Sequence, residues 1–384
     1  MIPLSVPNII GNASKYIKEC LDSEWVSSAG KYVDLFEKKI SEYTGSKYSV
    51  ACMNGTSALQ VSLRLAGVED GDEVIVPTLT FIAPVNAIVY NNATPVFMDV
   101  DIFYNIDINK TIDFLKSEII FKNGRSFNKK TKKRISAIIP VHMWGNAVYL
   151  DELISICDDL NITMVEDASE SLGTFYNSGK FKNYHTGTVG KLGCISFNGN
   201  KIITSGGGGM ILTDDKELAA KARYLTTQAK DDPIRYIHDE IGYNFRLTNL
   251  QAALGVAQLE QLPVFLKHKR KIFSQYQVKL EKIIGLNLAS VPNYAENNHW
   301  MNLLQIDSKI YGEDWEEIMW RLDKNDIQSR PVWALNHLQK PYKDCQSYKV
   351  KKAEECVNSS LCLPSSTNLS SENLNKVIRI LKND

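Results

Sequence analysis

The sequence predicts an α/β fold with a mostly parallel central sheet, followed by a smaller α+β domain. Over the first two thirds of the chain, short apolar runs alternate with helical patterns, which is the signature of parallel strands joined by crossover helices. After Asn249, long helices mix with short strands. A chain of 384 residues is too long for one simple core. We therefore expect a large domain over residues 1–250 and a small C-terminal domain over residues 251–384.

Six runs are the expected strands of the large domain: residues 48–53, 73–76, 95–100, 135–141, 162–166 and 193–197. Apolar residues at helical spacing predict a helix over residues 57–66, which Gly67 ends. Further on, residues 250–262 predict an Ala-rich helix stopped by Pro263, and residues 264–284 predict a longer one. Residues 302–306 and 327–332 are the expected short strands of the small domain.

Composition argues against several classes of protein. The 44 basic residues balance 44 acidic ones, so the charge indicates neither a nucleic-acid nor a membrane partner. The basic run 129–134, preceded by Asn123-Gly124, is expected to be a solvated hairpin insertion. The seven cysteines form no CxxC pair, and the six histidines lack ligand spacing, so we expect reduced thiols and no metal site. Without a signal sequence or a membrane span, a cytoplasmic location is expected.

The most informative stretch is Ser196-Phe-Asn-Gly-Asn-Lys201, which the glycines 206–209 follow. It places one amine just beyond an expected strand, beside hydroxyls and amides that suit a phosphate. A lysine there can be partly desolvated and therefore nucleophilic near neutral pH, which indicates a cofactor-anchoring residue. Taken alone, the stretch favours a surface lysine in a glycine-rich turn, because glycine runs usually only supply turns.

Three further motifs support a binding site. Asn54-Gly55-Thr56 lies between a strand and a helix, where amides and a hydroxyl can meet an anion; a helix cap by Thr56 or Ser57 is the alternative. Asp167, with Glu170 after it, ends a strand at the crevice edge of the sheet and could pair with a protonated ring nitrogen, or else cap a helix. Phe81 could stack on a flat ring or belong to the core.

Together these motifs carry a resemblance. The chain is similar over nearly its whole length to the sugar aminotransferase family that includes the erythromycin, streptomycin and perosamine pathway enzymes, which use pyridoxal 5'-phosphate. The similar segments are residues 25–30, 54–56, 77–86, 142–146, 166–168, 196–201 and 242–246. Segments 203–210, 225–232, 236–241 and 328–333 resemble more closely the branch that serves legionaminic acid and bacillosamine-type sugars. Gly207 stands where many relatives have Glu, and the lysine is intact.

The resemblance implies a role for each matching residue and an aspartate aminotransferase-like fold. Lys201 would form the internal aldimine, Asp167 would bond the pyridine nitrogen, and Phe81 would stack on the ring. The phosphate would be held by Gly55, Thr56 and Ser196, and by Asn244 from the neighbouring subunit, which implies a homodimer with shared active sites. Residues expected to contact substrate are Glu170, Arg246, Arg330, Trp333 and His337; for the last three, packing within the small domain is the alternative.

The implied reaction moves an amino group from glutamate to a nucleotide-linked 4-keto-6-deoxy sugar. We expect UDP-2-acetamido-4-keto-2,4,6-trideoxyglucose as substrate, for surface glycan or nonulosonic acid synthesis, with a perosamine-type GDP-4-keto-6-deoxymannose as the alternative. A sugar dehydratase of the same fold would carry histidine at Lys201. A non-catalytic sugar-binding regulator is disfavoured by the retained Asp167, Ser196 and Lys201. A nicotinamide oxidoreductase would need G-x-G-x-x-G, which residues 54–59 do not supply.

Overall fold

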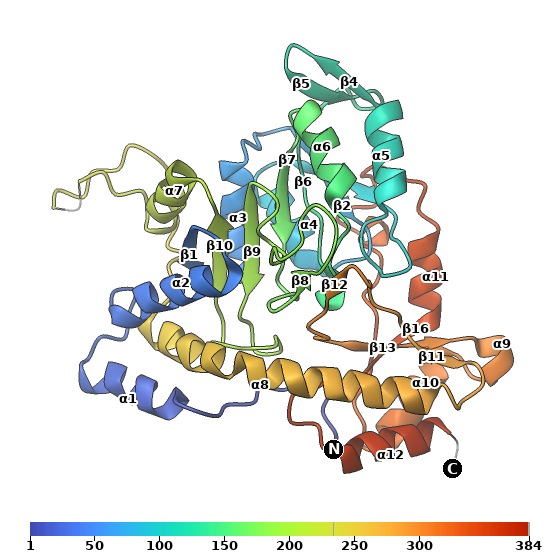
Figure 1. Cartoon of the computed structure of the whole chain (residues 1–384). Helices are drawn as coiled ribbons and strands as arrows, with labels where there is room; N and C mark the ends of the chain where they lie inside the picture. Colours follow the sequence, from blue (N-terminus) through green and yellow to red (C-terminus); the bar gives the residue numbers. More distant parts are fainter. Residues whose placement is uncertain (233, 383–384) are drawn as a thin grey trace.

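The computed structural model describes residues 1–232 and 234–382. A large sheet at its centre has the strand order β1-β10-β9-β7-β6-β2-β3-β15 (Figure 1). The bounds are β1 Tyr48–Cys52, β2 Glu73–Pro77, β3 Thr94–Met98, β6 Arg134–Ile138, β7 Thr163–Asp167, β9 Leu192–Ser196, β10 Gly209–Thr213 and β15 Ser347–Tyr348. Neighbours from β9 to β15 are parallel, and β10 is antiparallel to β1 and β9. The α/β prediction and its six strands are confirmed.

Both faces of this sheet are buried, as continuous apolar strands require. In β2, Val74 and Val76 join one core while Ile75 joins the other, because successive side chains of a strand point to opposite faces. The first core is shared with α2 Lys31–Thr44, α3 Gly55–Leu65, α4 Ile82–Tyr90 and α7 Lys216–Thr226; the second is shared with α5 Ile108–Ser117 and α6 Asp151–Asp159. The helices thereby hold the strand ends, where the site lies, in fixed positions.

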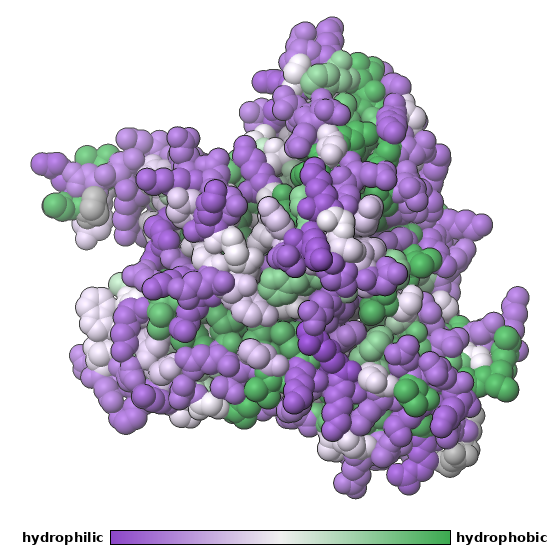
Figure 2. Space-filling model, in the orientation of Figure 1, coloured by the Kyte–Doolittle hydropathy of each residue, from purple (hydrophilic) through white to green (hydrophobic). Residues whose placement is uncertain are grey.

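A hairpin extends the sheet at one side. It consists of β4 Ile119–Lys122 and β5 Arg125–Asn128, and β5 pairs antiparallel with β6. Asn123 and Gly124 have left-handed φ values of 51° and 72°, as a two-residue hairpin turn needs. Hydrophilic side chains cover its outer end (Figure 2), and the basic run after it is exposed up to Arg134. The expected solvated hairpin is present.

A second, antiparallel sheet forms the C-terminal region, with the order β11-β13-β16-β14. Its elements are β11 Leu286–Leu288, β13 Asn302–Ile306, β14 Arg330–Pro331, β16 Ser360–Leu363, α9 Ser308–Tyr311, α10 Trp315–Lys324, α11 Lys352–Ser359 and α12 Ser371–Leu381. They enclose a third core. The amino-terminal Ile2 pairs with Ile327 in this region, and the amino terminus lies beside α12 (Figure 1). Between the two regions, β8 Phe175–Tyr176 pairs with β12 Ala295–Glu296.

The prediction that a helix stops at Pro263 is wrong. A single helix, α8 Asn249–Leu280, continues through it for 32 residues. A proline inside a helix removes one hydrogen bond and usually costs about 3 kcal/mol. Here Pro263 is exposed, while Leu262, Phe265 and Leu266 beside it are buried. The first half of α8 packs on α1 Ala13–Asp22 and α2, and the second half on β11 and α12, so packing outweighs the local penalty.

Three remaining expectations concern the cysteines, a membrane span and a metal site. Of the seven cysteines, all of which are free, six are buried and Cys345 is partly exposed, in agreement with the expected reduced thiols. In the described part of the chain, no helix combines the length and the apolar character needed to cross a bilayer. The same residues contain no cluster of three or more His, Cys, Asp or Glu suited to a metal ion.

Candidate active site

Several strand ends of the large sheet open onto one cavity of about 290 Å³. The chain leaving β1, β2, β7 and β9 contributes side chains to it, and the C-terminal region closes one side. Eight of the twelve residues singled out in the sequence line this cavity: Gly55, Thr56, Phe81, Asp167, Glu170, Ser196, Lys201 and Trp333. The cavity therefore joins motifs that lie far apart in the sequence.

Asp167 is the last residue of β7 and lies buried against the cavity. Its carboxylate accepts a hydrogen bond from the backbone N–H of Ser169 at 3.0 Å. Burial raises the pKa of Asp167, while hydrogen bonding from Ser169 and the positive charge of Lys201 partly counteract this effect. Residues 168–174, which follow Asp167, form turns and no helix, so the helix-cap alternative does not apply. A buried carboxylate whose pKa is raised in this way suits a cationic ligand.

The adjacent carboxylate, Glu166, points away from this cavity. It accepts hydrogen bonds from His142 Nε2 at 2.9 Å and from three backbone N–H groups, those of residues 187, 189 and 190. Burial by itself raises the pKa of Glu166, but the hydrogen bond from His142 and the amides hold it below the ordinary value. The carboxylate of Glu166 thus has its hydrogen-bond partners within the chain, and it fixes the loop of residues 187–190.

Helix α3 begins at the cavity wall. Asn54 caps it, because its Oδ1 accepts a hydrogen bond from Ser57 N at 2.7 Å. The alternative interpretation, in which Thr56 or Ser57 supplies the cap, therefore does not apply, and Thr56 remains beside the cavity. A Cβ on Gly55 would lie 2.9 Å from the Cβ of Ser196. Glycine at this position keeps open a cradle at the positive end of a helix, which suits a phosphate.

Lys201 lies in the turn after β9, and its side chain is 13% exposed. Its Nζ is 3.4 Å from Glu170 Oε1 and 4.3 Å from the ring centroid of Trp300. Glu170 is buried, and its other oxygen accepts a hydrogen bond from the N–H of Trp144 at 2.7 Å. Burial raises the pKa of Glu170, and Lys201 opposes that rise. The amine is thus held between a carboxylate and an aromatic face.

Aromatic rings form the remaining wall. Phe81 is 51% exposed, so it is not a core residue. Its ring lies 5.7 Å from that of Trp333, and Trp333 stacks on Trp144 at 5.3 Å with an interplanar angle of 20°. Flat apolar surfaces of this kind suit a ring system or a sugar face.

Four predicted residues do not line the cavity. Asn244 is exposed, and Arg246 donates from Nε to the carbonyl of Ser28 at 2.9 Å. Arg330 is exposed on β14, and Nδ1 of His337 lies 2.6 Å from Thr78 Oγ1. Their assigned contacts remain predictions. Conversely, Asn54, Asn198 and Asn200 line the cavity and belong to two of the motifs, although the sequence assigned them no role. Ser169 and Trp300 also line it and carry no sequence signal that distinguishes them from turn or core residues.

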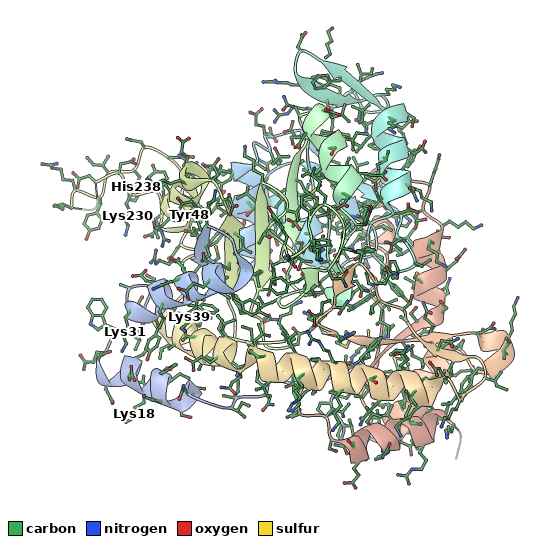
Figure 3. The ribbon with its side chains drawn as sticks, viewed as in Figure 1. Lys18, Lys31, Lys39, Tyr48, Lys230 and His238 are labelled. Carbon is green, nitrogen blue, oxygen red and sulfur yellow. The ribbon has the colours of Figure 1, made fainter. Side chains whose placement is uncertain are left out.

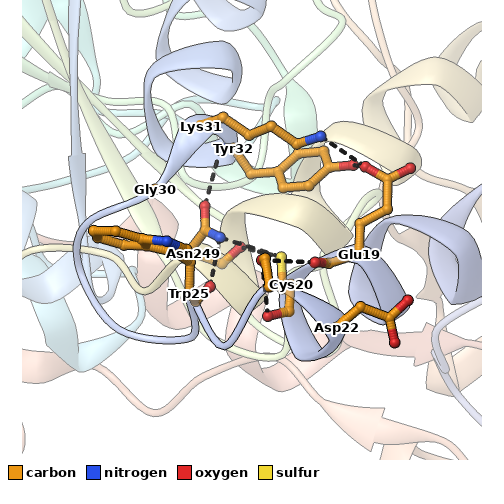
Figure 4. Close-up of a pocket in the computed structure, with 9 residues that line it drawn as sticks. Glu19, Cys20, Asp22, Trp25, Gly30, Lys31, Tyr32 and Asn249 are labelled. Atoms are coloured by element: carbon orange, nitrogen blue, oxygen red, sulfur yellow. Dashed lines mark hydrogen bonds and ion pairs between the residues drawn. The ribbon is translucent and has the colours of Figure 1, made fainter.

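A larger cavity, about 680 Å³, lies between α1 and α2 (Figure 4). Asn249 crosses it, donating to the carbonyl of Trp25 at 2.7 Å and accepting from Tyr32 N at 3.0 Å. At its rim Lys31 pairs with Glu19 at 2.8 Å. It shares no lining residue with the cavity at Lys201. We take the smaller cavity as the active site, because only there do an amine, a buried carboxylate and an anion cradle meet.

Comparison with known proteins agrees with this geometry. Residues 7–382 match the profile of the DegT/DnrJ/EryC1/StrS aminotransferase family. The chain belongs to this family. It is 34% identical to the putative pyridoxal phosphate-dependent aminotransferase EpsN of Bacillus subtilis, over 99% of this chain and 95% of that protein. It is 36% identical to the GDP-perosamine synthase of Caulobacter vibrioides, over 99% and 97% of the two chains.

Solved structures lead to the same assignment. A family aminotransferase from Brucella abortus superposes with a TM-score of 0.85 at 26% identity, over 97% of this chain and 95% of that one. The putative sugar aminotransferase Spr1654 from Streptococcus pneumoniae, in its PMP form, gives 0.86 at 25% identity, over 100% and 97%. The chain is accordingly a sugar aminotransferase that uses pyridoxal 5'-phosphate, and the fold, the cofactor and the reaction class expected from its motifs are confirmed.

Proposed function

We propose that this enzyme transfers the amino group of glutamate to C4 of a nucleotide-linked 4-keto-6-deoxy sugar. The observation that carries the proposal is the meeting of Lys201, Asp167 and the Gly55 cradle in one cavity. Lys201 occupies the position where dehydratases of this fold would carry histidine, which favours amination over dehydration. A purely sugar-binding regulator would not need a buried carboxylate and an amine on the same cavity.

The residues present fit the cofactor. A buried carboxylate at Asp167 with one backbone hydrogen bond can hold a protonated ring nitrogen, and the α3 terminus with Gly55, Thr56 and Ser196 can hold a phosphate. When bound there, pyridoxal 5'-phosphate supplies an electron sink for the substrate carbon. Phe81 would cover one ring face.

Two proton-handling groups of the chain are then available for the substrate. Lys201 Nζ can anchor the cofactor and, when free, move a proton at the reacting carbon. Glu170 accepts from Lys201 at one oxygen and from the N–H of Trp144 at the other, so it fixes where the free amine points. The aromatic wall of Trp333 excludes water from that side.

For the nucleotide, we propose UDP, with UDP-2-acetamido-4-keto-2,4,6-trideoxyglucose as the substrate. The resemblance of residues 203–210 and 225–241 to the legionaminic acid and bacillosamine-type branch supports it. The 36% identity to GDP-perosamine synthases from Caulobacter vibrioides and Escherichia coli O157:H7 favours a second candidate, GDP-4-keto-6-deoxymannose.

A panel of nucleotide 4-ketosugars with glutamate as donor tests this assignment. We expect the UDP acetamido sugar to give a product whose mass shows that an amino group has replaced the keto oxygen. This substrate should also have the largest kcat/KM of the panel. A preference for the GDP sugar would establish the second candidate. Failure of every 4-ketosugar, although glutamate still converts the cofactor to its amine form, would overturn the proposed acceptor class and leave the aminotransferase assignment intact.

We also propose a homodimer in which Asn244 reaches the partner's cofactor phosphate. Asn244 is exposed and lies outside its own chain's cavity. The chain between α7 and α8 carries Lys230 and His238 away from the body of the molecule (Figure 3). Nearby, Ile234, Tyr236 and Ile241 are 86%, 73% and 79% exposed, which is typical of a surface that another chain covers.

Subunit mixing tests the shared site. Lys201→Ala and Asn244→Ala chains should each be nearly inactive. An equimolar mixture should recover up to about a quarter of wild-type activity, since about half of the dimers are heterodimers and one of the two sites in each keeps both residues. Mass photometry and differently tagged chains establish that heterodimers form. If they form without recovering activity, Asn244 serves its own chain.

A further inference from the structure

One segment of the C-terminal region supplies one of the two groups that face the amine of Lys201 and bonds the backbone of the other. We call residues 297–301 the strap; it directly precedes β13. From the strap, Asn298 Nδ2 donates to the carbonyl of Glu170 at 2.8 Å. Two residues later the ring of Trp300 lies against Lys201 Nζ, at 4.3 Å. The strap thus supplies the aromatic face beside the amine and, through Asn298, holds the backbone of Glu170, whose carboxylate faces the same amine.

Trp300 is fixed at three points. Its Nε1 donates to the carbonyl of Asn200, the residue before Lys201, at 2.7 Å. Its backbone N–H donates to Asn298 Oδ1 at 2.9 Å, and its carbonyl accepts from Lys269 Nζ at 2.8 Å. Trp300 is 2% exposed. Its ring therefore has one available position relative to Lys201.

Lys269 is the unusual member of this set. It lies on α8 with 1% exposure, and its amine donates to the carbonyls of Trp300 and Ser365. Among the residues that the structure describes, Lys269 makes no ion pair with a carboxylate. Burying an ammonium without a counter-ion is costly. What the amine does here is tie the end of the strap to α8 at the carbonyl of Trp300.

We propose that Trp300, anchored by Lys269, is a positioning residue that holds the amine of Lys201 over the cofactor cavity. This inference rests on the proposed role of Lys201 as the cofactor anchor. The ring attracts the ammonium group and blocks one side of it, while Glu170 receives it on the other. Removal of the ring leaves the amine free to turn away from the cavity, although the phosphate cradle and Asp167 stay as they are.

The experiment uses the full-length apoprotein and three readouts. The first is the rate at which added pyridoxal 5'-phosphate becomes attached at Lys201, followed by absorbance and located by borohydride reduction and peptide mapping. The second is the affinity for pyridoxamine 5'-phosphate, which needs the cradle but no bond to the lysine. The third is the rate at which a small acetylating reagent modifies Lys201, measured by mass spectrometry without any cofactor.

For Trp300→Leu we expect attachment about fivefold slower, the order of one cation–π contact, and acetylation at least threefold faster, because the amine is uncovered. Affinity for pyridoxamine phosphate should stay within twofold. Trp300→Phe, which keeps a ring, should fall between this variant and wild type. Lys269→Met should change both rates in the same directions, by about half as much. Trp320→Leu, on the exposed face of α10 with 55% exposure, is the control for loss of a tryptophan.

Unchanged attachment and acetylation in Trp300→Leu would overturn the proposal. An equal loss of attachment and of pyridoxamine phosphate affinity would also overturn it, since Trp300 would then only shape the cavity. If Trp300→Leu fails to fold, Trp300→Phe and Lys269→Met decide by the same criteria. A wild-type protein labelled at a lysine other than Lys201 would instead contradict the proposed function, and the acetylation arm would still report on the contact.

Discussion

The floor and the wall of the active-site cavity are built in different ways. The floor consists of Gly55, Asp167, Ser196 and Lys201, which lie at the start of a helix, at the end of a strand or in the turn after a strand of the large sheet. The wall consists of Trp300 and Trp333, which come from the C-terminal region. Floor residues owe their positions to short local segments, whereas wall residues depend on contacts made across the whole chain.

The difference has a physical origin. In an open α/β sheet the carboxyl ends of the strands meet at one edge, so a polar residue just after a strand is directed to the ligand crevice. A residue in the wall has no such rule. Trp300 faces the cavity because Lys269 and Asn298 hold its backbone there. Lys269 is distant from Trp300 in the sequence, and Asn298 lies in a loop that has no distinctive sequence pattern.

The largest expected effect concerns the floor. Lys201→Ala should lower turnover by at least about a thousandfold, because no other amine lines the cavity among the described residues to take its place. Affinity for pyridoxamine 5'-phosphate should change by less than about threefold, since the cradle and Asp167 are untouched. Single-turnover kinetics and calorimetry measure the two quantities. Equal loss of both would mean that Lys201 shapes the cavity rather than acting in it.

The two carboxylates at the end of β7, Glu166 and Asp167, are expected to differ in role, and paired substitutions compare them. Asp167→Asn should reduce kcat by about a hundredfold with little change in stability, because a neutral amide no longer supports a ring cation but can still accept from Ser169. Glu166→Gln should do the reverse. It places an NH₂ group against backbone donors and should cost about 2 kcal/mol of folding free energy. Urea unfolding and steady-state kinetics on both variants separate the roles; matching behaviour would refute the distinction.

A smaller effect is expected at the cradle. In Gly55→Ala the new methyl group would lie 2.9 Å from Ser196 Cβ and 3.3 Å from Ser169 Oγ, in the space assigned to the phosphate. We expect about a tenfold weaker affinity for pyridoxal 5'-phosphate and for inorganic phosphate as competitor, with near-normal kcat at saturating cofactor. The control is Gly67→Ala, after the same helix, where no atom lies within 4 Å of the added Cβ. Its φ of 81° means that alanine there should cost folding free energy, so the two variants are compared by the cofactor affinity of the folded protein. If both variants bind the cofactor equally well, the cradle lies elsewhere.

The sequence predicted the floor more fully than the wall, for the same reason. Lys201, Asp167 and Gly55 were found because strand, turn and helix signals surround them. Local reasoning failed where distant packing decides: α8 passes Pro263 because buried neighbours on both sides hold it. At α3 the choice lay among neighbouring polar residues, and Asn54, not Thr56, caps the helix through a local hydrogen bond. Trp300 could not be found at all, since its role depends on Lys269 and Lys201. The contacts assigned to Arg246, Arg330 and His337 remain predictions.

The smallest expected effect tests the wall through its stability. Burial lowers the pKa of Lys269 to about 7, against about 10.4 for an unfolded lysine. Between these values the unfolded chain binds more protons than the folded one, so the wild-type free energy of unfolding should rise with pH. Met cannot titrate, so the stability of Lys269→Met relative to wild type should fall from pH 7 to pH 10.

We expect that relative stability to change by about 1–2 kcal/mol, less than the full pKa difference allows, because two carbonyl oxygens favour the ammonium form. Urea unfolding of both proteins at pH 7, 8.5 and 10 measures it. Lys267→Met, exposed on the same helix, is the control and should show no such trend. A flat difference for Lys269→Met would mean that the amine keeps its proton throughout, held by the two carbonyls, so that the strap is tied by a permanent charge.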